Sequence, residues 1–311
     1  MFLDVIKAHK AGNPENEEEN WTYLNQEEIV ELMRFKGVKV SRRVVRGLLK
    51  KHKYVKRKSQ KKIAGGSSEN RNEQFENISQ KVAIFRTAGD PVISMDTKKK
   101  ELIGKYSRGN DGLYGTSPEL TNDHDFKKKD TITGIPHGIY DEQLQHGQIV
   151  IGNSHDTSQF SCACIRNWWL KIGCVSYPFS SRLLILCDGG GSNSSRHYIF
   201  KEDLQKLAIE INIDITIAHY PPYCSKWNPI EHRFFPHVSN ALRRGATINS
   251  IEHMAEKIRH TKTKTGISVS VFIDENEYKT GRKYSEGFKE NNRIVFEEYL
   301  SKWNYTAKAN P

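Results

Sequence analysis

The stretch "RLLILCDGGGSN", residues 182–193, contains the clearest strand signal in this chain of 311 residues. Its apolar run predicts a strand buried within a sheet. The run stops at Asp188, and three glycines follow. Because glycine has no side chain, such a loop lets the backbone pass close to a nucleic-acid strand or a metal-bound phosphate. Aspartate also forms ordinary turns at strand ends, so Asp188 alone leaves both interpretations open.

Apolar runs on both sides of this strand indicate an α/β or α+β domain with a mixed sheet. Three consecutive strands come first, and helices and strands alternate after them. This order is typical of a layered domain in which helices flank the sheet. The predicted strands are 91–96, 101–106, 147–153, 182–188 and 214–220, and the predicted helices are 75–85, 157–171 and 200–211.

A second carboxylate, Asp96, ends the apolar run "PVISMD" at residues 91–96. Ligands on open α/β sheets gather near strand ends, so Asp96 and Asp188 would face one crevice if their strands are neighbours. Two carboxylates held close repel, and protonation or a divalent cation relieves the repulsion. Their hard oxygen atoms suit Mg²⁺ or Mn²⁺.

A third acid, Glu231, lies in "PYCSKWNPIEHRFF", residues 222–235. Asn228 fits the N-cap of a helix and Pro229 its first position. Glu231 is then the third helical residue, where an acid completes a capping box. A helix that touches the sheet would instead aim Glu231 at the crevice of the two aspartates. Both roles of Glu231, as part of a helix cap and as a catalytic acid, are open at this point. Two strand-end acids and a helical acid would suit two-metal phosphoryl transfer.

The net charge of +11 comes from one segment. Residues 42–62 hold 11 Lys or Arg and no acid, and the rest of the chain has 37 basic against 37 acidic residues. Such a concentration of positive charge favours a polyanion partner, most often nucleic acid. A solvated basic helix followed by a basic linker is the alternative.

The same segment begins in a predicted helix-turn-helix. Asn25 and Glu28 form a capping box for the first helix, and Ser41 caps the second. Gly37 closes the first helix, and a short turn joins the two. The expected inner residues are Ile29, Leu32 and Met33 on the first helix and Val44, Val45, Leu48 and Leu49 on the second.

The predicted DNA contacts follow from this arrangement. Arg42, Arg43 and Arg46 would face the major groove, while the lysines from Lys50 and Lys51 to residue 62 would follow phosphates. A helical pair with the same pattern but no DNA partner is the alternative. Lys98, in the lysine-rich turn after Asp96, either lines the DNA path or is solvated.

Composition sets the remaining boundaries. Residues 64–74, "AGGSSENRNEQ", read as a linker between a DNA-binding region, 1–63, and a catalytic domain, 75–311, with a C-terminal extension from about residue 246. Five cysteines without a C-x-x-C pair favour buried, reduced thiols. The longest aliphatic run is far short of a membrane span, and no secretory signal is visible. We therefore expect a cytoplasmic protein without a membrane partner.

Three blocks together resemble the acidic blocks of DDE transposases of the Rhodopirellula-type insertion-sequence family: "ISMDTKKKELIGKY", "LLILCDGGGSNSSR" and "HYPPYCSKWNPIEHRFF". The last block is also similar, more distantly, to the Asn-Pro-Ile-Glu block of mariner-like elements. The resemblance runs from about Asn70 to the C-terminus. It implies a ribonuclease H-like core in which Asp96, Asp188 and Glu231 are the catalytic and metal-binding acids.

The resemblance also implies a mechanism. Two Mg²⁺ or Mn²⁺ ions, bridged by Asp96, would activate water or a DNA 3′-hydroxyl and stabilise the leaving oxygen. Asn228 and His232 would support Glu231. The partners would be double-stranded DNA of the terminal inverted repeats and of the target, bound by a homo-oligomer at the nucleoid.

Two departures from the family pattern keep other functions open. Tyr223 and Cys224 stand where the pattern favours a small Gly-Thr pair, and the N-terminal region is short, as in a truncated copy. One alternative is an inert transposase that acts as a DNA-binding repressor. Another is a nuclease on the same fold that cleaves without joining. The feature that separates them is whether the three carboxylates meet.

Overall fold

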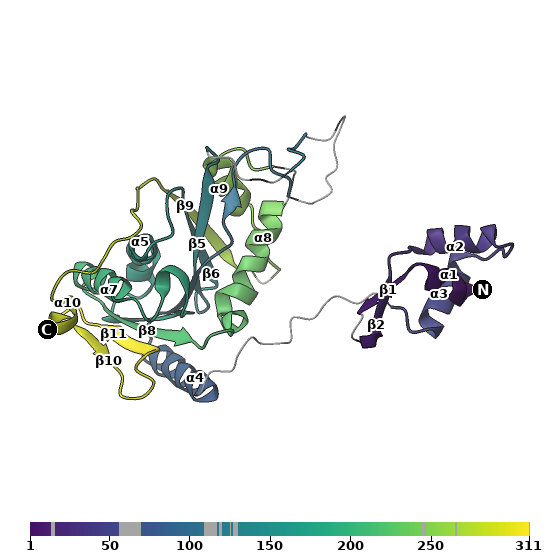
Figure 1. The fold of residues 1–311 in the computed structure, drawn as a ribbon. Coiled ribbons are helices and arrows are strands. Elements are labelled where there is room, and N and C mark those ends of the chain that lie inside the picture. The colour runs from purple at the N-terminus through teal and green to yellow at the C-terminus, as the bar shows by residue number, and fades with distance from the viewer. Residues whose placement is uncertain are drawn as a thin grey trace. The chain divides into compact units, whose positions relative to one another are not determined.

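The computed structural model describes residues 1–13, 16–55, 70–108, 117, 120–124, 126, 130–243, 245, 247–264 and 266–310. The chain divides into two compact units, residues 1–63 and 64–311 (Figure 1). The basic residues 56–62 and residues 64–69 of the predicted linker lie outside the described residues.

The first unit is helical with a small two-stranded sheet. Its two predicted helices are confirmed, with the predicted caps: the Asn25–Glu28 capping box opens one, and Ser41 accepts a hydrogen bond from the Val44 backbone in the other. An N-terminal helix and a hairpin were not predicted. The elements are α1 (Phe2–Ala8), β1 (Lys10–Asn13), β2 (Asn16–Thr22), α2 (Gln26–Phe35) and α3 (Arg42–Lys51).

The core of this unit explains why α1 is needed. Phe2, Val5 and Ile6 of α1 pack with Ile29 of α2 and Val45 of α3. Two short helices alone would leave these apolar faces in water, and α1 covers them. The expectation that Val44 faces inward is wrong, because its side chain is 47% exposed while its neighbour is fully buried.

A nine-stranded mixed sheet forms the second unit (Figure 1). The order is β10-β11-β8-β7-β3-β5-β6-β9, and β4 pairs with β5 outside this path. β3, β7 and β8 are parallel neighbours, whereas β5 runs antiparallel to both β3 and β6. The mixed sheet that the sequence predicted is therefore confirmed. The strands are β3 (Val92–Thr97), β4 (Glu101–Leu102), β5 (Thr133–Asp141), β6 (His146–Gly152), β7 (Arg182–Asp188), β8 (Asp214–Tyr220), β9 (Ser268–Asp274), β10 (Ile294–Phe296) and β11 (Asn304–Ala307).

The strand predictions succeeded where the apolar run was continuous. β7 and β8 have the predicted bounds, but of the strand predicted at 101–106 only the two residues of β4 form. The central strand β5 was missed because Pro136 and two glycines interrupt its apolar pattern. The strands after β8 were also missed.

Helices cover both faces of the sheet. On one face, α5 and α7 pack through Trp168 and Phe200 against the odd-numbered residues of β3 and β7. On the other face, α4 packs on β3 and β7, while η4, α8 and α9 pack on β5 and β6. The helical segments are α4 (Arg71–Thr87), α5 (Ser158–Trp168), η1 (Trp169–Gly173), α6 (Cys174–Ser176), η2 (Gly191–Asn193), α7 (Tyr198–Ile211), η3 (Ser225–Trp227), η4 (Ile230–Phe234), α8 (Phe235–Arg243), α9 (Ile251–Arg259) and α10 (Phe288–Asn291).

Helix α4 begins earlier than the sequence indicated. Residues 71–74, the end of the predicted linker, are helical. Gln74 is fully buried and donates to the His219 carbonyl at 2.9 Å and to Asn304 Oδ1 at 3.1 Å. Long-range hydrogen bonds thus extend the helix into a sequence that looks like a linker.

Two compositional expectations concern cysteines and membranes. All five cysteines are free thiols, and four are buried, whereas Cys174 is partly exposed. Across the described parts of the chain, no helix has the length and apolar character needed to span a membrane.

Candidate active site

Asp96 and Asp188 lie at the carboxyl ends of adjacent parallel strands. Ser94 of β3 pairs with Leu186 of β7, so two residues further along Asp96 stands beside Asp188. Neighbouring strands are about 4.8 Å apart and alternate residues share a face. Both carboxylates therefore lie on the face that α4 covers, as the sequence predicted for neighbouring strands.

Two glycines bring η4 close to these strands. Gly138 of β5 pairs with Asp96, and Gly147 of β6 pairs with Tyr140. A Cβ atom on Gly138 would lie 2.5 Å from the Phe235 ring, and one on Gly147 would lie 2.4 Å from the Phe234 ring. The missing side chains let the helical segment rest on the sheet. The sequence did carry this signal, because a glycine inside a strand often marks a close approach.

Glu231 reaches Asp96 from η4. The two side chains share a hydrogen bond, and Glu231 also acts electrostatically on Asp188. η4 is a π-helical turn, a local geometry that is frequent at functional sites. The structure therefore brings the three predicted acids together from β3, β7 and η4.

Asn228 does not cap the helix, so the capping-box interpretation of Glu231 is wrong. No side-chain cap bond forms at the start of η4. Asn228 is fully buried, and its Nδ2 donates to the Met95 carbonyl at 3.2 Å. It ties the turn before η4 to β3, one residue from Asp96. His232 is exposed and, among the described residues, forms no hydrogen bond or ion pair.

The pKa values of the two aspartates are strongly raised. Burial, the hydrogen bond that protonated Asp96 donates to Glu231, and the charges of Asp188 and Glu231 together raise the pKa of Asp96 to about 8. Burial and the charge of Glu231 raise the pKa of Asp188 to about 6. Oδ1 of Asp188 is buried and lacks a hydrogen-bond partner in the described structure. Protons or a cation are needed to balance this cluster.

Within the described residues, no three His, Cys, Asp or Glu side chains already stand in an arrangement that could hold a metal ion. The chemistry of the donors nevertheless fits a hard divalent cation: three carboxylates, one of them with a buried, unpartnered oxygen.

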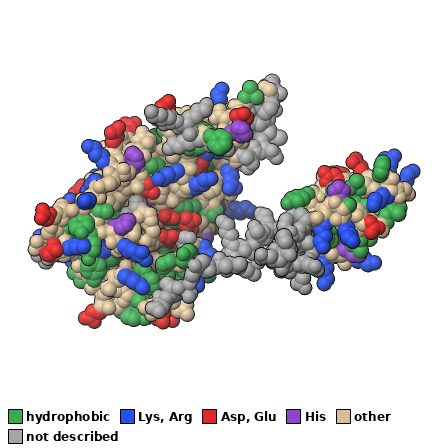
Figure 2. All heavy atoms as spheres, viewed as in Figure 1, with side chains coloured by type: hydrophobic (Ala, Val, Ile, Leu, Met, Phe, Trp, Pro, Cys, Tyr) green, Lys and Arg blue, Asp and Glu red, His purple; other side chains and the backbone are tan. Residues whose placement is uncertain are grey.

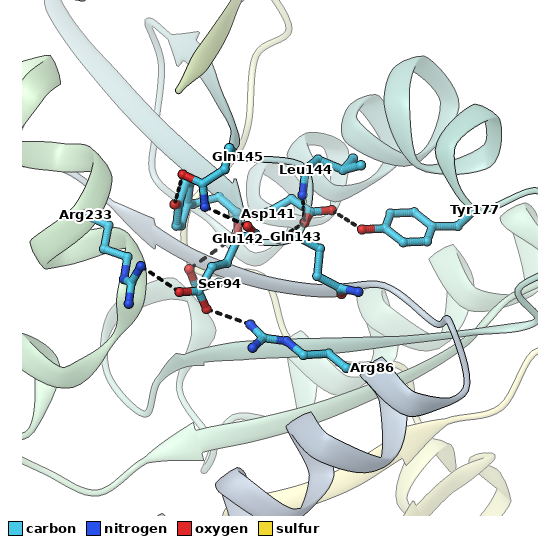
Figure 3. Close-up of polar contacts among 10 residues, drawn as sticks. Arg86, Ser94, Asp141, Glu142, Gln143, Leu144, Gln145, Tyr177 and Arg233 are labelled. Atoms are coloured by element: carbon cyan, nitrogen blue, oxygen red, sulfur yellow. Dashed lines mark hydrogen bonds and ion pairs between the residues drawn. The ribbon is translucent and has the colours of Figure 1, made fainter. Parts of the chain in front are cut away.

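Two salt bridges connect the β5–β6 turn of the sheet to α4 and η4 (Figure 3). Glu142, in the β5–β6 turn, pairs with Arg86 of α4 at 2.6 Å and with Arg233 of η4 at 2.8 Å. Next to it, Asp141 accepts a 2.8 Å hydrogen bond from the Tyr177 hydroxyl. Glu142 was not predicted from the sequence as part of the site. Glu142 lies in a turn, and its partners Arg86 and Arg233 are distant from it in sequence.

Two cavities flank the acids, on a face where acidic side chains are surrounded by lysines and arginines (Figure 2). One, of about 520 Å³, is lined by Glu231, Lys98 and Arg108. Lys98 is only 10% exposed and pairs with Glu101 at 3.3 Å, so this predicted DNA contact is engaged within the protein. The other, of about 640 Å³, begins at Asp188.

The other predicted DNA-binding residues belong to the first unit. Arg42, Arg43, Arg46, Lys50 and Lys51 are all exposed on α3. Arg42 pairs with Glu27 of α2 at 2.8 Å, and both side chains are largely exposed. An exposed pair of this kind is weak and does not prevent a phosphate from binding.

Comparisons with known proteins agree with the resemblance. The family model described as the Rhodopirellula transposase DDE domain matches residues 2–309. The match thus starts well before Asn70, where the sequence blocks placed its beginning. No curated protein matches the chain.

Among solved structures, the chain is similar to Mos1 transposase. A pre-cleavage Mos1 transpososome has 12% identity and a TM-score of 0.43, with 82% of this chain and 68% of that chain covered. A Mos1 mariner paired-end complex with Mn has 14% identity and a TM-score of 0.41, with 75% of this chain and 65% of that chain covered.

Proposed function

We propose, because this chain belongs to the Rhodopirellula transposase DDE domain family, that it cuts the ends of transposon DNA and joins them to target DNA. The observation that carries the proposal is the meeting of Asp96, Asp188 and Glu231 on one face of the sheet. An inert DNA-binding protein would have no need to bury three carboxylates against one another, since burying unbalanced charge opposes folding.

Asp96, Asp188 and Glu231 would hold Mg²⁺ or Mn²⁺, two ions by the family mechanism. When bound, the ions would activate the attacking hydroxyl and stabilise the leaving oxygen of the phosphodiester. The chain's own residues supply the position of the acids. Asn228 holds the start of η4 to β3, and Gly138 lets η4 approach, so that Glu231 faces Asp96.

DNA is the expected partner at both units. Solved Mos1 complexes include a paired-end complex with a left transposon end and a strand transfer complex. For this chain, Arg42, Arg43 and Arg46 of α3 would enter the major groove, and Lys50 and Lys51 would contact phosphates. A homo-oligomer would bring two transposon ends together.

A cleavage assay on DNA that carries the element ends tests the proposal. With Mg²⁺ or Mn²⁺, the wild type should nick or cut these ends and form joined products. Asp188→Ala should abolish cleavage and leave DNA binding almost unchanged. The exposed Asp123→Ala is the matched control and should cleave normally.

The other possible outcomes would change either the residues assigned to the site or the function assigned to the protein. Cleavage retained by Asp188→Ala would remove Asp188 from the site. DNA binding by the wild type without any cleavage would favour the repressor. Cleavage without joined products would favour a ribonuclease H-like nuclease.

A further inference from the structure

The cavity of about 640 Å³ beside Asp188 combines positive charge with aromatic walls; we refer to it as the aromatic cavity. Lys201, Arg196 and Lys302 line it, as do Tyr198, Tyr223 and Phe296. Gly189 and Gly190, which follow β7, line it, and so does Asp188, whereas Asp96 and Glu231 do not. The roles proposed for the three acids do not involve the aromatic cavity.

Lys201 is a buried cation for which the described part of the chain supplies no counter-ion. Its side chain belongs to α7, is 2% exposed, and donates to the Ser195 carbonyl at 2.5 Å. Among the described residues, no carboxylate lies within ion-pair distance of it, whereas Lys206 on the same helix pairs with Glu202 at 2.8 Å. Burial lowers the pKa of Lys201 to about 8. Because buried charges are normally paired, a lysine that lines an open cavity in this state is suited to an incoming anion.

The aromatic walls are arranged around the same lysine. Nζ of Lys201 lies 5.4 Å from the Tyr198 ring centroid and 5.8 Å from that of Phe296. Lys302, at the rim, lies over Trp303 at 4.2 Å. Aromatic side chains beside lysine and arginine are the combination that binds single-stranded nucleic acid, since every base has a face on which a ring can stack.

Tyr223 adds an independent sign of function. Its φ of +63° lies in the left-handed region, where a bulky residue is an outlier. Its side chain is 69% exposed, so packing of the ring does not offset this strain. Strained residues that persist in a fold gather at ligand-binding sites. Tyr223 is also one of the two residues, with Cys224, that depart from the small pair expected in this block.

We propose that the aromatic cavity binds one unpaired nucleotide of the DNA strand that passes Asp188, with its phosphate on Lys201 and its base against Tyr223 and the neighbouring rings. The proposal rests on the proposed function, because the reacting strand has to lie at Asp188. The nucleotide must be unpaired, because a base inside a duplex cannot offer its face to a side chain.

The test compares the affinity of the full chain for two labelled DNAs, a blunt duplex and the same duplex with a short single-stranded tail. The wild type should bind the tailed DNA more tightly. Tyr223→Ala and Lys201→Met should each reduce this preference by about fivefold or more, the lower end of what one stacked base contributes. An abasic tail should give a similar loss with the wild type.

Two control variants match these changes. Lys206→Met removes a lysine from the same helix, and Tyr299→Ala removes an exposed tyrosine; neither residue lines the cavity. Both should keep the preference for the tailed DNA. If Lys201→Met does not fold, the exposed Tyr223→Ala decides alone.

A preference for tailed DNA that is absent in the wild type, or that survives both Tyr223→Ala and Lys201→Met, overturns the proposal. Failure of the proposed function is a separate result. If the wild type never cleaves element ends but its tail preference depends on Tyr223, the nucleotide site stands and the transposase activity does not. If it cleaves and the variants keep the preference, only the nucleotide site is lost.

Discussion

Replacing Asp96 by asparagine should change how the stability of the second unit depends on pH in the absence of metal. In the folded protein the pKa of Asp96 is raised from 3.8 to about 8, chiefly by burial and by the hydrogen bond that protonated Asp96 donates to Glu231. A carboxyl group with a raised pKa stabilises the folded state while it keeps its proton. This contribution is complete below pH 3.8 and is lost as the pH rises through about 8.

The expected magnitude follows from this shift. Between pH 6 and pH 8 the unfolded chain has lost the proton, whereas folded Asp96 goes from protonated to half-protonated. Each pH unit of full linkage changes the free energy of unfolding by about 1.4 kcal/mol. The wild type should therefore lose about 2 kcal/mol across this window through Asp96. Asp188, with its pKa raised to about 6, acts in the same direction mainly below pH 6.

Urea unfolding at pH 6 and pH 8 with a chelator measures the difference. Tryptophan fluorescence reports mainly on the second unit, because Trp168, Trp169, Trp227 and Trp303 belong to it and only one tryptophan lies in the first. Asp96→Asn should be less destabilised than the wild type when the pH is raised. The pH dependence of the two proteins should differ by about 2 kcal/mol.

The control for this experiment is Asp123→Asn, which changes an exposed aspartate and should follow the wild type. Equal pH dependence of the wild type and Asp96→Asn would refute the reasoning. Asp96 would then titrate alike in the folded and unfolded states, and the crowding of the three acids would have no energetic consequence.

Three further predictions concern metal, packing and DNA. Mg²⁺ or Mn²⁺ should raise the melting temperature of the wild type more at pH 8 than at pH 6, because cations and protons compete for the three carboxylates; the same gain at both values would speak against these ligands. Gly138→Ala should destabilise the second unit by about 1–3 kcal/mol in urea unfolding and abolish cleavage, while Gly190→Ala, whose Cβ meets open space, should keep its stability. Charge reversal of Arg42, Arg43 and Arg46 should weaken duplex binding and flatten its salt dependence in a titration at several salt concentrations, and unchanged binding would discard α3 as the DNA-binding helix.

Several features of the site could be predicted from the sequence because they depend on neighbouring residues. The continuous apolar run of β7 located the strand and its final Asp188, and β3 did the same for Asp96. The helix caps at Asn25 and Ser41 were correct for the same reason. Burial and local capping leave a periodic mark in the chain.

The sequence by itself thus determined the class of the fold, the strand-end acids and the concentration of positive charge before the second unit. Only the tertiary structure decided that Gly138 and Gly147 let η4 pack closely on the sheet, and that Asn228 bonds to β3 and does not cap the helix of Glu231. It also decided that Lys201 lines a cavity with no counter-ion among the described residues. The physical reason is the range of the interactions. A strand or cap is stabilised by residues a few positions apart, whereas the position and pKa of a buried group depend on partners that only folding brings into contact.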